Sequence, residues 1–142
     1  MHPYAATVRI SATPERVWPV LADVVRWPEW LPTMISVEPL GAAPLAIGAR
    51  YKIAQPRLRP TIWSVVKLEP LRSFAWQASW PGARALATHS LSSAPGGSSD
   101  VVLQVHFWGP LSVLARALAG RLTREYLARE VASLKQQVEA QS

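Results

Sequence analysis

Residues 109–138 read GPLSVLARALAGRLTREYLAREVASLKQQV and have the length and periodicity of one long helix. Apolar residues recur at intervals of three and four, in two stripes on opposite faces of a straight helix that turns about 100° per residue. One stripe consists of Leu111, Leu114, Leu118, Leu122 and Tyr126. The other consists of Val113, Ala117, Gly120, Leu127, Val131, Leu134 and Val138.

The second stripe changes in size along the helix, since Val113, Ala117 and Gly120 are small and the later residues are bulky. A sheet packed on this face would be well filled over the C-terminal half of the helix and under-filled over the N-terminal half. The pattern therefore predicts a pocket beside the first half. The alternative is that Gly120 kinks or breaks the segment into two amphipathic helices, because glycine costs about 1 kcal/mol inside a helix.

The chain before this helix is predicted to be mostly strand. Alternating or apolar runs bounded by glycine and proline predict strands over residues 4–10, 34–40, 49–55, 61–69, 73–79, 84–92 and 101–108. Thr13, Pro14 and Glu15 form a typical helix start, with Pro19 predicting a bend or a later start. Residues 27–32 carry too many prolines for more than one helical turn. This order predicts an α+β fold in which seven antiparallel strands curve around one long helix.

Length and composition restrict the class of protein. A chain of 142 residues suits one domain, and the absence of cysteine excludes disulfides and thiolate sites. The net charge of +6 comes from twelve arginines and three lysines that are spread along the chain, which argues against a nucleic-acid surface. No stretch predicts export or a membrane span, so we expect a cytoplasmic protein without stable membrane insertion.

Several motifs resemble one known superfamily. The runs ISATPERVW at residues 10–18 and RWPEW at 26–30, with Leu21 and Asp23 between them, are similar to the opening of START-like, Bet v 1-like (SRPBCC) proteins. Within that superfamily the sequence resembles the bacterial polyketide cyclase/dehydrase and lipid-transport group. Further similar fragments are GAR at 48–50, WSV at 63–65, LEP at 68–70, FAW at 74–76, His89 and GP at 109–110.

The resemblance covers nearly the whole chain and implies a fold and a general role. It implies that residues 1–142 form a single START-like ligand-binding domain with the helix-grip fold. In that fold a seven-stranded antiparallel sheet wraps around the C-terminal helix, and two short helices lie between strands one and two. It also implies an apolar cavity between sheet and helix, without a shared catalytic set.

The residues that could carry chemistry are few. The three histidines and two aspartates do not compose a nucleophilic triad, and no third ligand accompanies His89 and His106 for a metal. These two histidines lie on neighbouring predicted strands, and the strand register decides whether they share a face. His89 is interpreted either as a polar group lining the cavity or as a strand histidine that bonds a neighbour or faces water.

The aromatic residues are interpreted as the lining of a pocket for a flat or lipid-like ligand, or as the core of a tryptophan-rich domain. With their apolar neighbours they give the predicted cavity set: Trp30, Met34, Tyr51, Ile53, Trp63, Phe74, Trp76, Trp80, His89, Val113 and Ala117. Trp18 and Trp27 are assigned to structural packing. Arg57 and Arg59, on a loop bounded by prolines, are either solvated or could meet a carboxylate or phosphate at the cavity mouth.

We therefore predict a protein that binds, and could transport or sequester, an apolar or aromatic small molecule. It is expected to need no cofactor, metal or nucleic acid. One alternative is a cyclase- or dehydratase-type enzyme, for which His89 is the candidate catalytic residue. A second is a protein- or membrane-interaction module that uses the outward leucine stripe of the long helix, a stripe that would also suit a homodimer.

Overall fold

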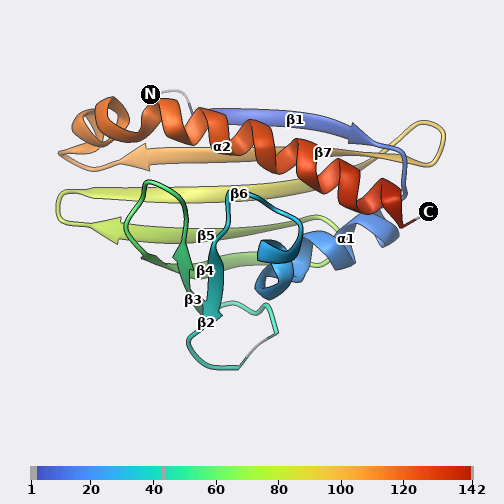
Figure 1. Cartoon of the computed structure of the whole chain (residues 1–142), viewed down its shortest axis with the longest axis horizontal. Helices are drawn as coiled ribbons and strands as arrows, with labels where there is room; N and C mark the ends of the chain where they lie inside the picture. The colour runs from blue at the N-terminus through green and yellow to red at the C-terminus, as the bar shows by residue number, and fades with distance from the viewer. Residues whose placement is uncertain (1–2, 43, 142) are drawn as a thin grey trace.

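The computed structural model describes residues 3–42 and 44–141, and Figure 1 shows its seven strands and two α-helices. In chain order the elements are β1 (Tyr4–Ile10), α1 (Pro14–Ala22), the 3-10 helix η1 (Val24–Glu29), β2 (Ser36–Pro39), β3 (Arg50–Ala54), β4 (Thr61–Glu69), β5 (Ser73–Trp80), β6 (Ala83–Ala94), β7 (Ser98–Trp108) and α2 (Ser112–Ala140). The predicted elements are all present, with boundaries shifted by a few residues.

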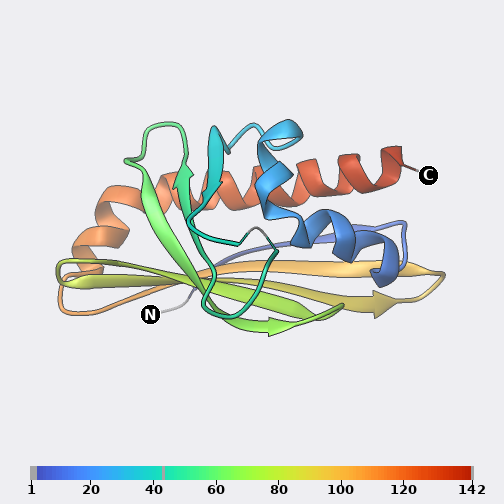
Figure 2. The same ribbon diagram turned by 90° about the horizontal axis from the view of Figure 1, so that it is seen from below.

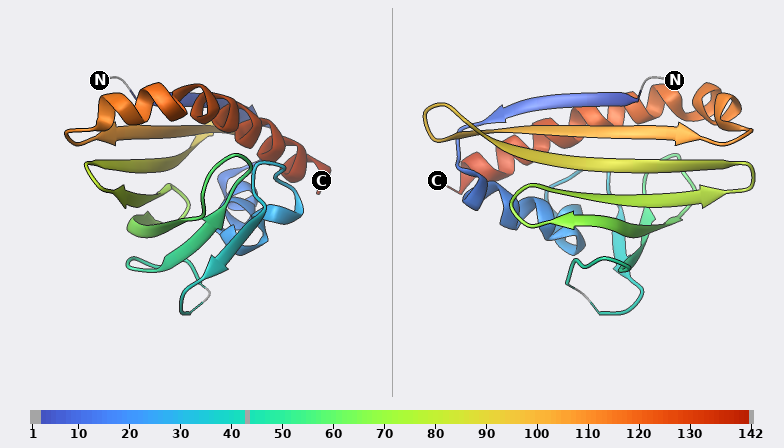
Figure 3. Two further views of the ribbon diagram at one scale, coloured as in Figure 1. Left: turned by 60° about the vertical axis from the view of Figure 1, so that its left-hand side comes forward. Right: turned by 180° about the vertical axis from the view of Figure 1, so that it is seen from behind.

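The strands form one antiparallel sheet in the order β1-β7-β6-β5-β4-β3-β2, so β1 and β2 are its two edges. The sheet curls strongly, and α2 lies along its concave side while α1 and η1 close one end (Figure 3). The predicted helix-grip fold is therefore confirmed.

The long hairpin of β6 and β7 settles which histidine faces the interior. His89 pairs with Leu103, whereas His106 pairs with Leu86. His89 and Leu103 are buried on the concave side, while the half-buried His106 points to the other face and stacks on Trp108 at 6.0 Å between ring centroids. The two histidines therefore lie on opposite faces.

Helix α2 is unbroken through Gly120, but its first turns bend away from the axis of the remainder (Figure 2). Its C-terminal half buries Leu127, Val131, Leu134 and Val138, as predicted. The expected position of Val113 and Ala117 is wrong, because both are exposed, Val113 by 70%. The residues expected to face the sheet were assigned by assuming a straight helix. Because the first turns bend, other residues face the sheet near the start of α2.

At Gly120, α2 lies close against Tyr4 of β1. A Cβ atom at Gly120 would lie 3.0 Å from Cζ of Tyr4 and nearer still to its hydroxyl oxygen. The Tyr4 ring is held between the edge of Phe107, at 6.2 Å between centroids, and the Arg116 guanidinium, at 4.3 Å from the ring centroid. Glycine is needed here because this packed ring occupies the space of a side chain.

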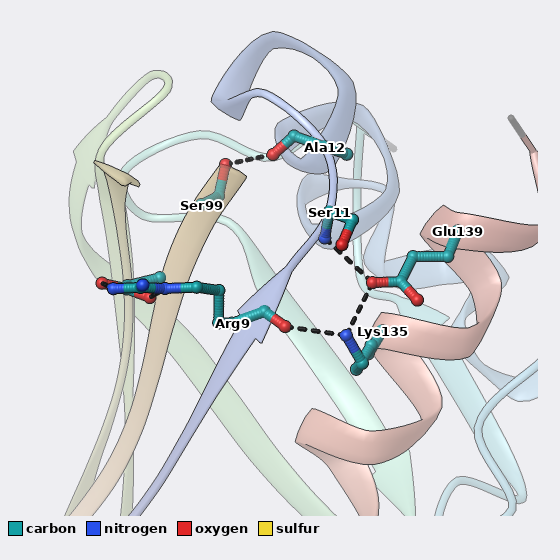
Figure 4. Close-up of polar contacts among 7 residues, drawn as sticks. Arg9, Ser11, Ala12, Ser99, Lys135 and Glu139 are labelled. Carbon is teal, nitrogen blue, oxygen red and sulfur yellow. Dashed lines mark hydrogen bonds and ion pairs between the residues drawn. The ribbon is translucent and has the colours of Figure 1, made fainter. Parts of the chain in front are cut away.

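The C-terminal half of α2 is tied to the end of β1 by polar contacts (Figure 4). Lys135 Nζ donates to the carbonyl oxygen of Arg9 at 2.9 Å and lies 2.7 Å from the Glu139 carboxylate, which also accepts from the Ser11 amide at 2.9 Å. Together with the Gly120 contact, these bonds hold α2 over β1 and β7. Helix α2 therefore packs mainly on β1 and β7 and much less on β6.

The first helix also departs from expectation. α1 begins at Pro14, directly after Thr13 as predicted, and continues through Pro19, so the later start expected from Pro19 does not occur. Thr13 makes no side-chain capping bond, and its carbonyl oxygen accepts from the amides of Arg16 and Val17 at 2.9 and 3.0 Å. Pro19 and Glu15 are both exposed, so water can reach the carbonyl that Pro19 leaves without a donor.

Candidate functional site: an apolar cavity under the long helix

A cavity of about 390 Å³ lies between α2 and the concave face of β3 to β7. Apolar and aromatic side chains make up most of its wall. The lining residues are Trp27, Met34, Ile53, Gln55, Leu58, Arg59, Thr61, Trp63, Trp76, Trp80, Ala85, Ala87, Thr88, His89, Leu103, Val105, Phe107, Ala115, Leu118, Ala119, Thr123, Tyr126, Leu127 and Glu130. This volume falls within the range of sites for small organic ligands, roughly 300 to 1,000 Å³.

Small residues on two elements line the space. Strand β6 contributes Ala85 and Ala87 to the cavity wall, and α2 contributes Ala115 and Ala119. A methyl group fills little volume, so these positions leave room that leucine or phenylalanine would occupy. The under-filled helix face predicted from the sequence therefore exists, but it is formed by Ala115 and Ala119 instead of Val113 and Ala117.

The cavity opens to solvent at one side. Four of its lining side chains are exposed: Arg59, Leu58 and Trp80, the last two by 41% each, and Leu118 by 79%. The connection between β3 and β4 closes on α2 here, because the Tyr126 hydroxyl donates a hydrogen bond to the Pro56 carbonyl oxygen. Arg59, on the same connection, lines the cavity, which places a cation beside the opening.

Six of the eleven predicted cavity residues line this space: Met34, Ile53, Trp63, Trp76, Trp80 and His89. Among these six, Trp80 is exposed by 41% and stands at the opening. Val113 and Ala117 lie outside the cavity, for the reason given above.

The other three predicted residues lie behind or beside the wall. Tyr51 and Phe74 are fully buried and pack against Trp76, with ring centroids 5.9 and 5.4 Å from it. They support the wall without lining the cavity. Trp30 borders a second, much smaller void.

Trp27 combines the structural role predicted for it with a place in the cavity wall. Its Nε1 donates to the Leu21 carbonyl oxygen at 3.1 Å, which fixes η1 against α1. The same indole lines the cavity and lies 5.4 Å from Trp76 between centroids. The sequence alone could not show that Trp27 both packs η1 against α1 and lines the cavity, because only the tertiary fold places η1 over the sheet.

His89 is a neutral hydrogen-bonding group in the wall. Its Nδ1 lies 3.3 Å from the Phe74 carbonyl oxygen, and its ring stacks on Phe74 at 4.1 Å between centroids. A carbonyl can only accept, so Nδ1 carries the hydrogen and Nε2 keeps its lone pair. Burial lowers the pKa of His89 to about 4, against the opposing effect of that bond, so the ring is neutral at pH 7.

Glu130 is the acidic residue of the cavity wall, and the sequence reasoning missed it. It projects from α2 into the cavity wall, and burial raises its pKa to about 8. Within residues 3–42 and 44–141, no hydrogen bond or ion pair joins its carboxyl group to another residue. The available signal was its spacing, because it lies three residues after Leu127 and four before Leu134 on the flank of the buried stripe.

Glu130 and His89 meet at the closed end of the cavity. Both border a second void of about 10 Å³, which is roughly the space of one water molecule. Its lining is Leu21, Trp27, Trp30, Leu31, His89, Leu103, Glu130 and Leu134. A carboxylic acid and an imidazole from two different elements therefore share one small, otherwise apolar space.

The part of the chain that the structure describes contains no group of three or more His, Cys, Asp or Glu residues arranged to hold a metal ion. Within that same part, no helix has both the length and the apolar character required to cross a membrane.

Comparison with known proteins agrees with this architecture. The family model described as polyketide cyclase/dehydrase and lipid transport matches residues 1–139. No curated protein matches the sequence.

Among solved structures, TTHA0849 from Thermus thermophilus has a TM-score of 0.77 at 20% identity, covering 99% of both chains. The ZhuI aromatase/cyclase from Streptomyces has a TM-score of 0.76 at 18% identity, covering 97% of this chain and 93% of its own. Norcoclaurine synthase from Thalictrum flavum has a TM-score of 0.75 at 12% identity, covering 99% and 96%. Identities this low show a shared fold and nothing more. The match of the family model along nearly the whole sequence shows that the chain belongs to the polyketide cyclase/dehydrase and lipid transport family.

Proposed function

We propose that this protein binds a hydrophobic or aromatic small molecule in the cavity beneath α2, for transport or sequestration. The observation that carries the proposal is the cavity itself, which is large enough for an organic ligand and walled by Trp27, Trp63, Trp76 and Trp80. Tryptophan offers a broad apolar surface with a single donor, which suits a flat ligand.

Burial of apolar ligand surface alone provides enough free energy for binding, with no catalytic group required. Burying about 300 Å² of apolar ligand surface at roughly 25 cal/mol per Å² stabilises the complex by about 7 kcal/mol before ordering costs. Such a ligand would bind with micromolar affinity at best. Few polar groups line the cavity, so they would serve to orient the ligand.

A thermal-shift panel of fatty acids, flavonoids and polyketide-like aromatic compounds tests the proposal. At least one class is expected to raise the melting temperature of the native protein. Ala119→Phe places a ring in the cavity and is expected to abolish that rise, whereas Ala128→Phe, on the exposed face of the same helix, leaves it unchanged. Equal shifts in all three proteins would place binding elsewhere, and no shift in any would contradict the proposal.

A second candidate function is cyclisation or dehydration of a bound ligand. One observation favours it, namely that an uncharged carboxylic acid and an imidazole with a free lone pair meet at the closed end. Glu130 could give a proton and the Nε2 atom of His89 could take one, as general acid and base. His89→Gln should then abolish turnover of a substrate while the melting temperature stays near that of the wild type. Retained turnover would remove His89 from the reaction.

A role in contacts with other molecules is supported by the outward residues of α2. Leu111, Leu114 and Leu118 are exposed by 49, 53 and 79%. We infer from them that this face can bind a second copy of the chain, and a prediction is given below. A cytoplasmic location stays a prediction that cell fractionation would check.

A further inference from the structure

The closed end of the cavity presents a hydrogen-bond donor and an acceptor that the protein leaves uncommitted. His89 uses Nδ1 to donate to Phe74, so its Nε2 lone pair is the remaining acceptor. Burial raises the pKa of Glu130 to about 8, so at pH 6.5 its carboxyl group has one O–H group to donate. Both side chains border the same void of about 10 Å³, so one small group can lie within reach of both.

A hydroxyl group fits this arrangement because it accepts and donates through one oxygen atom. An ether or a ketone could accept from Glu130 but would leave Nε2 without a donor. A hydrocarbon would leave both polar groups buried without a partner, which is unfavourable.

We propose that the closed end of the cavity recognises a hydroxyl group of the ligand, which accepts a hydrogen bond from Glu130 and donates one to Nε2 of His89. This inference rests on the proposed binding function and narrows the ligand to an apolar or aromatic alcohol or phenol. The remainder of the molecule would lie along Trp76 and Trp27 toward the opening.

Charged ligand groups fit the closed end less well. The other ionisable groups in the cavity wall are Arg59, on the β3–β4 connection beside the opening, and Tyr126, whose hydroxyl is already bonded to Pro56. An anionic group at the closed end would thus meet Glu130 without a cation beside it. An ammonium group would need Glu130 to ionise inside a largely apolar wall, which burial opposes.

The test compares probes of matched shape by isothermal titration calorimetry at pH 6.5. The probes are 2-naphthylmethanol, the isosteric 2-ethylnaphthalene, 2-naphthylmethylammonium and 2-naphthoate. Binding of the ethyl compound reports on the proposed binding function. The ratio of the association constants for the alcohol and the ethyl compound reports on the hydroxyl site.

Glu130→Leu removes the donor and is expected to lower this ratio by about tenfold, the usual effect of one buried hydrogen bond. Glu130→Gln keeps a donor at the same place and should retain most of the ratio, which also covers the case in which the leucine variant folds poorly. Glu125→Gln is the matched control, because Glu125 is exposed on the same helix.

Four outcomes are distinguishable. A fall of the ratio in Glu130→Leu with unchanged binding of the ethyl compound supports the hydroxyl site. An unchanged ratio overturns the hydroxyl site and leaves the proposed binding function standing. Tighter binding of the ammonium or the carboxylate probe than of the alcohol also overturns it. Failure of all four probes to bind contradicts both the hydroxyl site and the binding function.

Discussion

Gly120 sets how closely α2 approaches β1, because the Tyr4 ring occupies the space beside its Cα atom. We expect Gly120→Ala to lower the free energy of unfolding by about 1–3 kcal/mol, since overpacking outweighs the gain in helix propensity. Chemical denaturation would measure this change. Tyr4→Phe removes the hydroxyl that the new methyl group would meet. The double variant should therefore lose less stability than the sum of the two single changes, and simple additivity would show that the contact is not limiting.

Glu130 makes stability depend on pH. Its pKa of about 8 in the folded protein exceeds the ordinary 4.5, so the folded state holds a proton that the unfolded state releases between these values. The contribution of Glu130 to the free energy of unfolding should therefore fall as pH rises from 4.5 to 8, by at most about 5 kcal/mol at 1.36 kcal/mol per pH unit. Glu130→Gln should flatten this fall in thermal melts across that range, whereas Glu125→Gln should not. An identical slope in wild type and Glu130→Gln would contradict the assignment.

His89 acts in the opposite direction. Burial lowers the pKa of His89 from 6.5 to about 4. Between pH 4 and 6.5, the unfolded state therefore binds a proton that the folded state does not bind. Its contribution to stability is present above pH 6.5 and is lost as pH falls toward 4. His89→Gln should reduce the acid sensitivity of the melting temperature between pH 6.5 and 4. His106→Gln is the matched control on the neighbouring strand, and an equal effect from both would remove His89 as the cause.

At the scale of elements, the connection between β3 and β4 is held on α2 by the bond from Tyr126 to Pro56. Tyr126→Phe removes only the hydroxyl, and we expect a loss of about 1 kcal/mol in the local stability of residues 56–60. Hydrogen exchange would measure this as roughly fivefold faster exchange of the Leu58 amide, which bonds the Gln55 carbonyl at 3.2 Å. The turn at residues 95–97 should be unaffected and serves as an internal control. Equal acceleration at both places would indicate global destabilisation instead.

The element scale also explains which parts of the fold were predictable. Strands β1, β4 and β5 were predicted nearly to the residue, because alternation along a strand reflects its own two faces. The position of Val113 and Ala117 was not predictable, because the first turns of α2 bend away from the axis of the remainder and a straight-helix projection does not include that bend. The placement of His89 likewise depended on its register with Leu103, which neither strand specifies alone.

At the scale of the whole molecule, the exposed start of α2 predicts self-association. Leu111, Leu114 and Leu118 are exposed and are spaced to share one side of the helix, and apolar side chains gathered on one surface favour a partner. We expect light scattering to show a dimer that forms with rising protein concentration. Leu114→Glu should shift it toward monomer, whereas Leu71→Glu, at an exposed leucine in the β4–β5 turn, should not. A monomer at all concentrations in the wild type would contradict this prediction.

Much of the candidate site could be predicted, and the misses have a common cause. Met34, Ile53, Trp63, Trp76, Trp80 and His89 were expected in the cavity wall and line it. Trp27 was not placed in the cavity wall because it was assigned to structural packing. Glu130 was overlooked because it lies beside the buried apolar stripe of the long helix. Whether such a side chain faces a void or a packed neighbour depends on residues from other elements.

The sequence by itself determined the order of strands and helices, the curved antiparallel sheet and the family, since periodicity, turn residues and the opening motif are local. Only the tertiary structure decided where the cavity lies and what lines it. The alanines of β6 and α2 leave empty volume only because Gly120, Lys135 and Glu139 hold α2 over β1 and β7. A cavity is bounded by several elements and depends on how they are placed relative to one another, so no single stretch of sequence can encode it.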